Sequence, residues 1–118
     1  MTQPWSLWLL PDARDNVKYK NIIKNISLKT GLSYFEPHLT LFGRINANPE
    51  PFFEFFKNMA NKQKTISTKI KKIKFGTSHW KSFYIEIEKN RSLEALQKQM
   101  IAPINHLRDY LFDPHLSL

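Results

Sequence analysis

Two histidines, His38 and His115, sit in two copies of one seven-residue phrase. The first copy reads Phe-Glu-Pro-His-Leu-Thr-Leu over 35–41, and the second reads Phe-Asp-Pro-His-Leu-Ser-Leu over 112–118. Each difference between the copies keeps the chemistry, with carboxylate for carboxylate and hydroxyl for hydroxyl. A matched pair in a chain of 118 residues predicts two equivalent half-sites that meet on one substrate.

The spacing within each phrase indicates what the half-sites offer. Side chains alternate between the faces of a strand, so His38 shares a face with Thr40, and His115 with Ser117. The leucines between them then point into the core. The proline before each histidine removes a backbone donor and favours an extended approach to the strand.

Phosphoryl transfer needs this set of groups. One imidazole can take a proton from the attacking nucleophile while the other gives a proton to the leaving oxygen. The hydroxyls can hydrogen-bond the non-bridging oxygens, where charge accumulates. The alternative is two similar sheet strands with incidental histidines, and the repeated hydroxyl disfavours it.

Hydrophobic patterns predict the elements that position the two phrases. Strands are expected at 5–10, 38–42, 65–75 and 83–88 and at the second phrase, with Gly43 ending the second strand and a bulge near Lys71. Helices are expected at 17–30, ended by Gly31, at 51–61, and from an N-cap at Ser92 to about residue 106. Pro103 is expected to kink or split the last of these helices. The order β-α-β-α-β-β-α-β predicts one compact α+β domain over residues 1–118.

Composition narrows the class of protein. The chain has no cysteine, so neither a disulfide framework nor a thiolate site can form. It has no apolar run near the roughly 20 residues of a membrane span and no secretory signal, so a soluble cytoplasmic protein without membrane contact is expected. The net charge of +8 is compatible with an anionic partner, and equally with a lysine-rich composition that has no functional meaning.

At the two phrases the chain resembles the 2H phosphoesterase superfamily, which is named for two His-x-Thr/Ser motifs. The stretch over 35–43, which ends Leu-Phe-Gly, and the opening Trp-Ser-Leu-Trp-Leu-Leu-Pro over 5–11 look most like its cyclic phosphodiesterase branch. The resemblance implies a bilobal fold of two β-sheet halves around a central phosphate cleft. Family members continue past the second motif, so the second lobe is expected to be incomplete in this sequence, or its tail to come from another chain by self-association.

The resemblance also implies an activity: opening of a cyclic phosphodiester to a phosphomonoester without a metal or cofactor. The implied substrates are ADP-ribose cyclic phosphate and nucleoside 2′,3′-cyclic phosphates. By similarity, His115 activates water and His38 protonates the leaving oxygen, while Thr40 and Ser117 hold the phosphate. The alternatives are a 2′-5′ RNA ligase-like enzyme that acts on RNA ends and a non-catalytic RNA or nucleotide-binding module.

Some residues outside the phrases have two interpretations. Trp80 could stack on a substrate base with a lysine nearby for a phosphate, or simply anchor a loop. Trp8 is predicted to be a core residue. The lysines of 69–74 are predicted to form a solvated strand face that could also attract polyanions.

Overall fold

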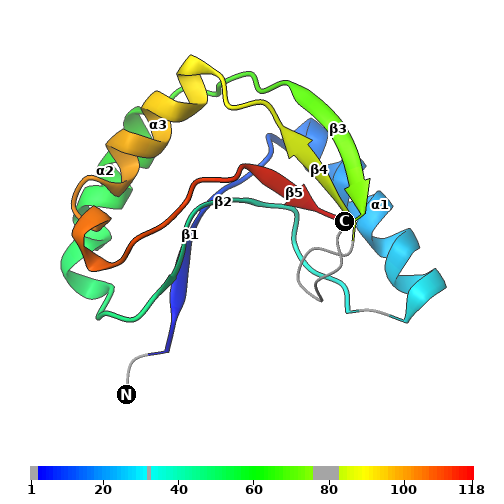
Figure 1. The fold of residues 1–118 in the computed structure, drawn as a ribbon, viewed down its shortest axis with the longest axis horizontal. Coiled ribbons are helices and arrows are strands. Elements are labelled where there is room, and N and C mark those ends of the chain that lie inside the picture. The colour runs from blue at the N-terminus through cyan, green and yellow to red at the C-terminus, as the bar shows by residue number, and fades with distance from the viewer. Residues whose placement is uncertain (1–2, 32, 76–82) are drawn as a thin grey trace.

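Helices and strands alternate along the chain in the predicted order (Figure 1). A computed structural model describes residues 3–31, 33–75 and 83–118. The strands are β1 (Trp5–Leu9), β2 (Leu39–Ile45), β3 (Ile70–Phe75), β4 (Phe83–Ile87) and β5 (His115–Ser117). The helices are α1 (Ala13–Thr30), α2 (Phe53–Lys62) and α3 (Arg91–Ile101), with short 3₁₀ turns at Glu50–Phe52 and Asn105–Leu107.

The five strands form one antiparallel sheet in the order β1-β2-β5-β4-β3. The sheet curves through an arch, with α2 and α3 together at one end and α1 at the other (Figure 1). The α+β class is confirmed. The described residues form a single sheet, and a second lobe is not seen among them.

The two phrases lie at the centre of this sheet. β5 pairs with β2 on one side, where Leu39 faces Leu116, and with β4 on the other. Its insertion joins two antiparallel strand pairs, β1–β2 and β3–β4. Segments far apart in the sequence therefore become neighbouring strands.

The core lies on one face of the sheet. The leucines of both phrases point into it, as predicted: Leu39, Leu41 and Leu116 are each no more than 6% exposed. Leu93 and Leu96 of α3 pack on them, and Phe56 of α2 lies at the margin. Because the helices cover this face, the side chains that alternate with the buried leucines lie on the opposite face of the sheet.

The helix ends follow capping chemistry. The Asp12 side chain accepts a hydrogen bond from the Asp15 amide at 2.9 Å, and Gly31 ends α1 in the left-handed conformation at φ 74°, as predicted. The predicted N-cap at Ser92 is wrong, because the Asn90 side chain takes that role at 2.8 Å from the Leu93 amide. α3 ends at Ile101, so the predicted run to about residue 106 is wrong, while the predicted break at Pro103 is confirmed, because the ring of proline cannot continue a helix.

The end of β2 differs from the prediction, and the bulge in β3 agrees with it. β2 runs through Gly43 to Ile45, so the predicted end at Gly43 is wrong. A Cβ at Gly43 would lie 3.4 Å from the Tyr110 ring, so glycine here leaves room for that ring against the strand. The predicted bulge is confirmed by a register shift between Ile70 and Lys72.

None of the described helices combines the length and the apolar character that crossing a membrane requires.

Candidate active site

The two histidines are held by the same local device. His38 Nδ1 lies 2.8 Å from the Glu36 carbonyl oxygen, and His115 Nδ1 lies 2.8 Å from the Asp113 carbonyl oxygen. A carbonyl can only accept, so Nδ1 of each ring must donate. In the neutral imidazole this leaves Nε2 unprotonated and able to take a proton. The repetition of the phrase is thus a repetition of geometry.

The register of β2 and β5 brings the two half-sites together. Because Leu39 faces Leu116 in an antiparallel pair, one step along each strand puts Thr40 opposite His115 and His38 opposite Ser117. Directly opposite residues have Cβ atoms about 4.5–5.5 Å apart. All four side chains alternate with core leucines, so they share the other face of the sheet, which we call the motif face. Each imidazole therefore has a hydroxyl from the other phrase beside it.

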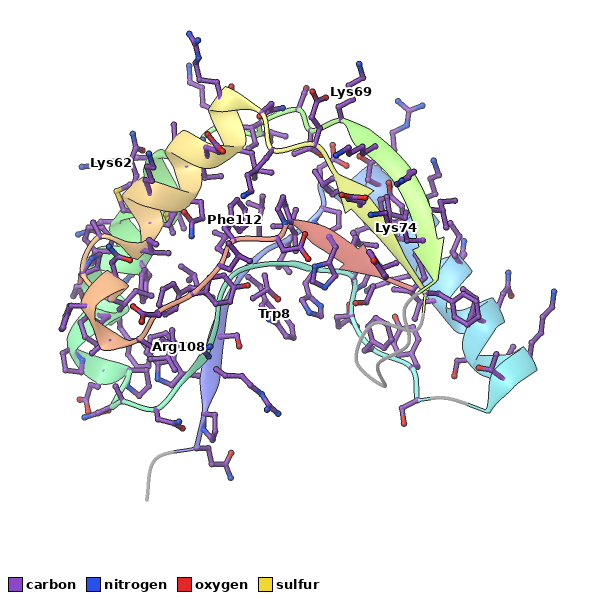
Figure 2. All side chains as sticks on the ribbon, viewed as in Figure 1. Trp8, Lys62, Lys69, Lys74, Arg108 and Phe112 are labelled. Carbon is purple, nitrogen blue, oxygen red and sulfur yellow. The ribbon has the colours of Figure 1, made fainter. Side chains whose placement is uncertain are left out.

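Trp8 completes this arrangement on the β1 side. Its Cα pairs with Thr40, and its ring stacks on the His38 ring with centroids 3.7 Å apart and planes 15° apart. The prediction that Trp8 is a core residue is wrong: it is 47% exposed and projects on the hollow side of the arch (Figure 2). Leu7 and Leu9 pack on the core, and the pairing of Trp8 with Thr40 puts Trp8 on the motif face.

The surroundings of His38 change its affinity for a proton. Burial lowers the pKa of His38, and the nearby His115 lowers that pKa further, against a smaller upward effect of the hydrogen bond to Glu36. His38 therefore loses its proton more readily than an ordinary imidazole does. The stacked Trp8 ring contributes to the burial of one face of this imidazole.

On the far side, β4 adds polar groups next to the second phrase. Glu86 pairs with His115 and Tyr84 with Ser117, and the Tyr84 ring meets the His115 ring edge-on at 5.6 Å. The Lys74 ammonium lies 2.8 Å from the Glu86 carboxylate, and this hydrogen bond is the main cause that lowers the pKa of Glu86. The carboxylate is thus held as an anion beside the site.

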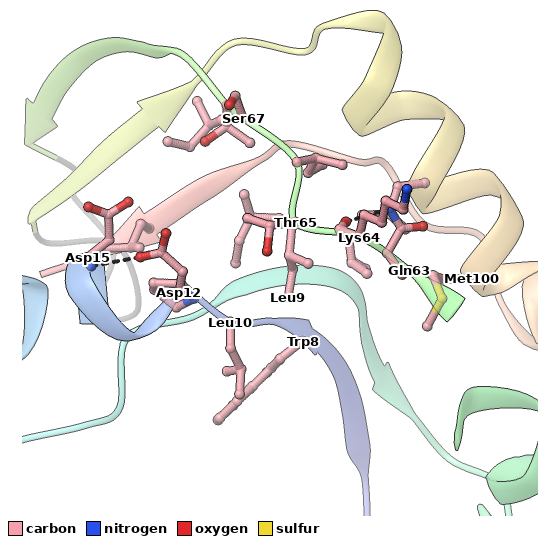
Figure 3. A pocket seen from close by; sticks show the side chains of 18 of the residues that line it. Trp8, Leu9, Leu10, Asp12, Asp15, Gln63, Lys64, Thr65, Ser67 and Met100 are labelled. Atoms are coloured by element: carbon pink, nitrogen blue, oxygen red, sulfur yellow. Dashed lines mark hydrogen bonds between the residues drawn. The ribbon is translucent and has the colours of Figure 1, made fainter. Parts of the chain in front are cut away.

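A cavity of about 730 Å³ lies between the sheet and the segment that precedes β3 (Figure 3). Its floor contains Leu39, Leu41 and Leu116, which are on the core-facing side of the sheet. The histidines are on the other side. We therefore place the candidate chemistry on the open motif face and not in this cavity.

The structure brings together four of the five predicted site residues. His38, Thr40, His115 and Ser117 share one face and adjoin one another. Trp80 lies outside the described residues. The sequence does not predict Trp8, Tyr84 and Glu86 as site residues, because their place on the motif face depends on which strands pair and in which register.

Comparison with known families agrees with this geometry. The family model described as cyclic phosphodiesterase-like protein matches residues 1–118. The chain belongs to the cyclic phosphodiesterase-like family. No curated protein matches it significantly. In this cyclic phosphodiesterase-like protein, both histidines lie on one face of the sheet.

Proposed function

We propose that the protein hydrolyses a cyclic phosphodiester to a phosphomonoester through His38 and His115. The observation that carries this proposal is the pairing of Leu39 with Leu116, which sets the two motifs side by side on one face. Family membership supports a cyclic phosphate as the substrate class. Within that class we propose ADP-ribose cyclic phosphate or a nucleoside 2′,3′-cyclic phosphate.

The reaction balances with the groups present. A water oxygen attacks phosphorus as one neutral imidazole takes its proton at Nε2. The bond from phosphorus to one ring oxygen breaks, and that oxygen takes a proton from the other imidazole, which starts as a cation. Thr40 and Ser117 donate to the non-bridging oxygens, and exchange with solvent restores the starting protonation of both rings.

We assign His115 as the base and His38 as the acid, following the family resemblance. Because burial lowers the pKa of His38, this ring must gain a proton before it can act as an acid. An anionic phosphate next to the ring favours the charged imidazole. We therefore propose that His38 takes up its proton together with the substrate.

The test is turnover of each proposed cyclic phosphate by the wild type and by single variants. His38→Ala and His115→Ala should each lower kcat by roughly 10²–10⁴, the usual contribution of an acid or base. Thr40→Val keeps the shape, removes the hydroxyl, and should cost roughly 10²-fold by analogy with loss of one charge-stabilising donor. Circular dichroism checks that each variant is folded, and His106→Ala is the matched control because His106 is exposed in the 3₁₀ turn away from the motif face.

Two results would overturn the proposal. One is undiminished turnover after either motif histidine is removed from a folded protein. The other is a wild type that turns over none of the proposed cyclic phosphates.

A further inference from the structure

The basic strand β3 extends the motif face beyond the histidines. Lys72 pairs with Glu86, which pairs with His115, and Lys74 pairs with Tyr84, which pairs with Ser117. Both lysines therefore belong to the same cross-strand rows as the second motif. Neighbouring strands lie about 4.8 Å apart, so each lysine backbone is roughly 10 Å from the motif strand, and the flexible stem can span much of that distance.

The local charge is positive in spite of Glu86. Its carboxylate lies 2.8 Å from the Lys74 ammonium and 3.7 Å from the Lys71 ammonium. Lys72 also acts on Glu86 electrostatically, but among the described residues it makes no ion pair within 4.0 Å. Asp113 adds a second carboxylate that acts on Lys74 from a distance. Three ammonium groups thus stand against two carboxylates, and Lys72 keeps its hydrogen-bonding capacity for an outside anion.

The position of Glu86 decides where an anion can bind. The Glu86 carboxylate next to His115 repels negative charge from the surface of β4, which lies between the motif strand β5 and β3. A single phosphate is therefore favoured at the motif residues, and a further phosphate is favoured beyond Glu86, at the lysines. Figure 2 shows Lys74 over the β4 and β5 end of the sheet, across the motif strands from Trp8.

We propose that Lys72 and Lys74 form a second anion subsite, which selects nucleotide substrates that carry a further phosphate group besides the cyclic one. This inference rests on the proposed function, because the four motif residues, His38, Thr40, His115 and Ser117, must hold the first phosphate. The occupant is a small nucleotide with phosphates at opposite ends of a ribose. A phosphodiester of an RNA chain is the competing occupant, and the experiment separates the two.

Binding measurements test the subsite without depending on turnover. Isothermal titration calorimetry would compare adenosine 2′-phosphate with adenosine 2′,5′-bisphosphate, which differ by one phosphate. We expect the wild type to bind the bisphosphate at least roughly fivefold more tightly, the size of one exposed charge contact. Lys72→Gln should reduce this preference severalfold, and higher ionic strength should reduce it in the wild type.

Two further variants sharpen the reading. Glu86→Gln removes the repelling carboxylate and should increase the preference for the bisphosphate, the opposite sign to Lys72→Gln. Lys62→Gln removes one exposed lysine at the end of α2, which packs on the other face, and should keep the wild-type preference. The opposite signs distinguish a local subsite from a general effect of net charge.

Equal affinity for the two ligands in the wild type would overturn the inference, and so would a preference that survives Lys72→Gln. Stronger binding of an RNA dinucleotide ending in a 2′-phosphate, without a preference for the bisphosphate, would assign β3 to RNA and reject the small-nucleotide subsite. Failure of the proposed function is a separate result. The wild type would then turn over none of the proposed cyclic phosphates and would still bind the bisphosphate more tightly than the monophosphate.

Discussion

At the scale of single residues, the hydrogen bond from each histidine to the carbonyl two residues earlier sets the chemistry. Both Nδ1 atoms are occupied by backbone acceptors, at 2.8 Å in each phrase. In the proposed reaction, this leaves both Nε2 atoms for proton transfer. One short phrase therefore specifies both the side chain and its tautomer.

Trp8 tunes His38 by covering one face of its ring. Trp8→Leu removes the stacked indole, exposes the imidazole to water and should raise the pKa of His38 toward its ordinary value of 6.5. Trp8→Phe keeps a flat ring and should leave more of the depression in place. The measurement is an NMR titration of the His38 ring protons. An unchanged His38 pKa in Trp8→Leu would show that the stacked ring has no part in the shift.

The residue scale also shows what sequence reasoning could reach. The four motif residues could be predicted because their spacing matches the strand period, and the structure places them on one face. Trp8 was misjudged because an apolar run of consecutive residues carries no alternation signal, and only its register against Thr40 reveals its side. Glu86 could not be found from spacing alone, since its place beside His115 depends on which strands pair.

At the scale of elements, α3 supports the site from behind. It packs Leu93 and Leu96 on the leucines of the motif strands, and its buried Gln97 side chain donates to the Leu41 carbonyl at 3.1 Å. The helix thereby fixes β2 from the core side. A substitution in α3 should therefore shift the motif residues even though α3 lies on the opposite face of the sheet.

The start of α3 gives a stability prediction. Asn90→Ala removes the side-chain cap on the Leu93 amide and should lower the free energy of unfolding by about 1 kcal/mol. Asn90→Asp keeps an acceptor and should retain most of the stability. Arg91→Ala, at the next and exposed position, is the control and should change little. Urea denaturation measures all three, and equal stability of Asn90→Ala and the wild type would refute the capping role.

Element boundaries were harder to predict than element order. The order followed from hydrophobic periodicity, which the packing confirms. The ends depended on local competition, as where Asn90 rather than Ser92 caps α3 and where β2 continues through Gly43. Such choices are decided by backbone geometry that a single sequence leaves open.

At the scale of the whole molecule, burial of His38 links folding to pH. Its pKa is lowered in the folded protein, so the unfolded chain binds more protons between the folded pKa and about 6.5. The contribution to stability is fully present above about pH 6.5 and is lost as the pH falls through the folded pKa. The free energy of unfolding should therefore decrease on acidification through this window.

A difference measurement isolates this effect. Urea unfolding at about pH 7.5 and at a pH below the folded pKa of His38, found by the NMR titration above, should show a smaller loss of stability for His38→Gln than for the wild type, because glutamine does not titrate. His106→Gln is the control, since that residue is exposed. An equal loss in His38→Gln and the wild type would mean that other groups account for the pH dependence.

The antiparallel pairing of two nearly identical phrases gives the centre of the sheet an approximate twofold symmetry. A local twofold axis passes between Leu39 and Leu116 and exchanges His38 with His115 and Thr40 with Ser117. The motifs alone therefore cannot tell an incoming water from a departing oxygen. Among the residues that the structure describes, the neighbouring strands break that symmetry, with the Trp8 indole on one side and the Tyr84 phenol, the Glu86 carboxylate and the β3 lysines on the other. For the proposed reaction, the orientation of a substrate across the sheet would therefore be set by the side chains of β1, β4 and β3 and not by the repeated phrase.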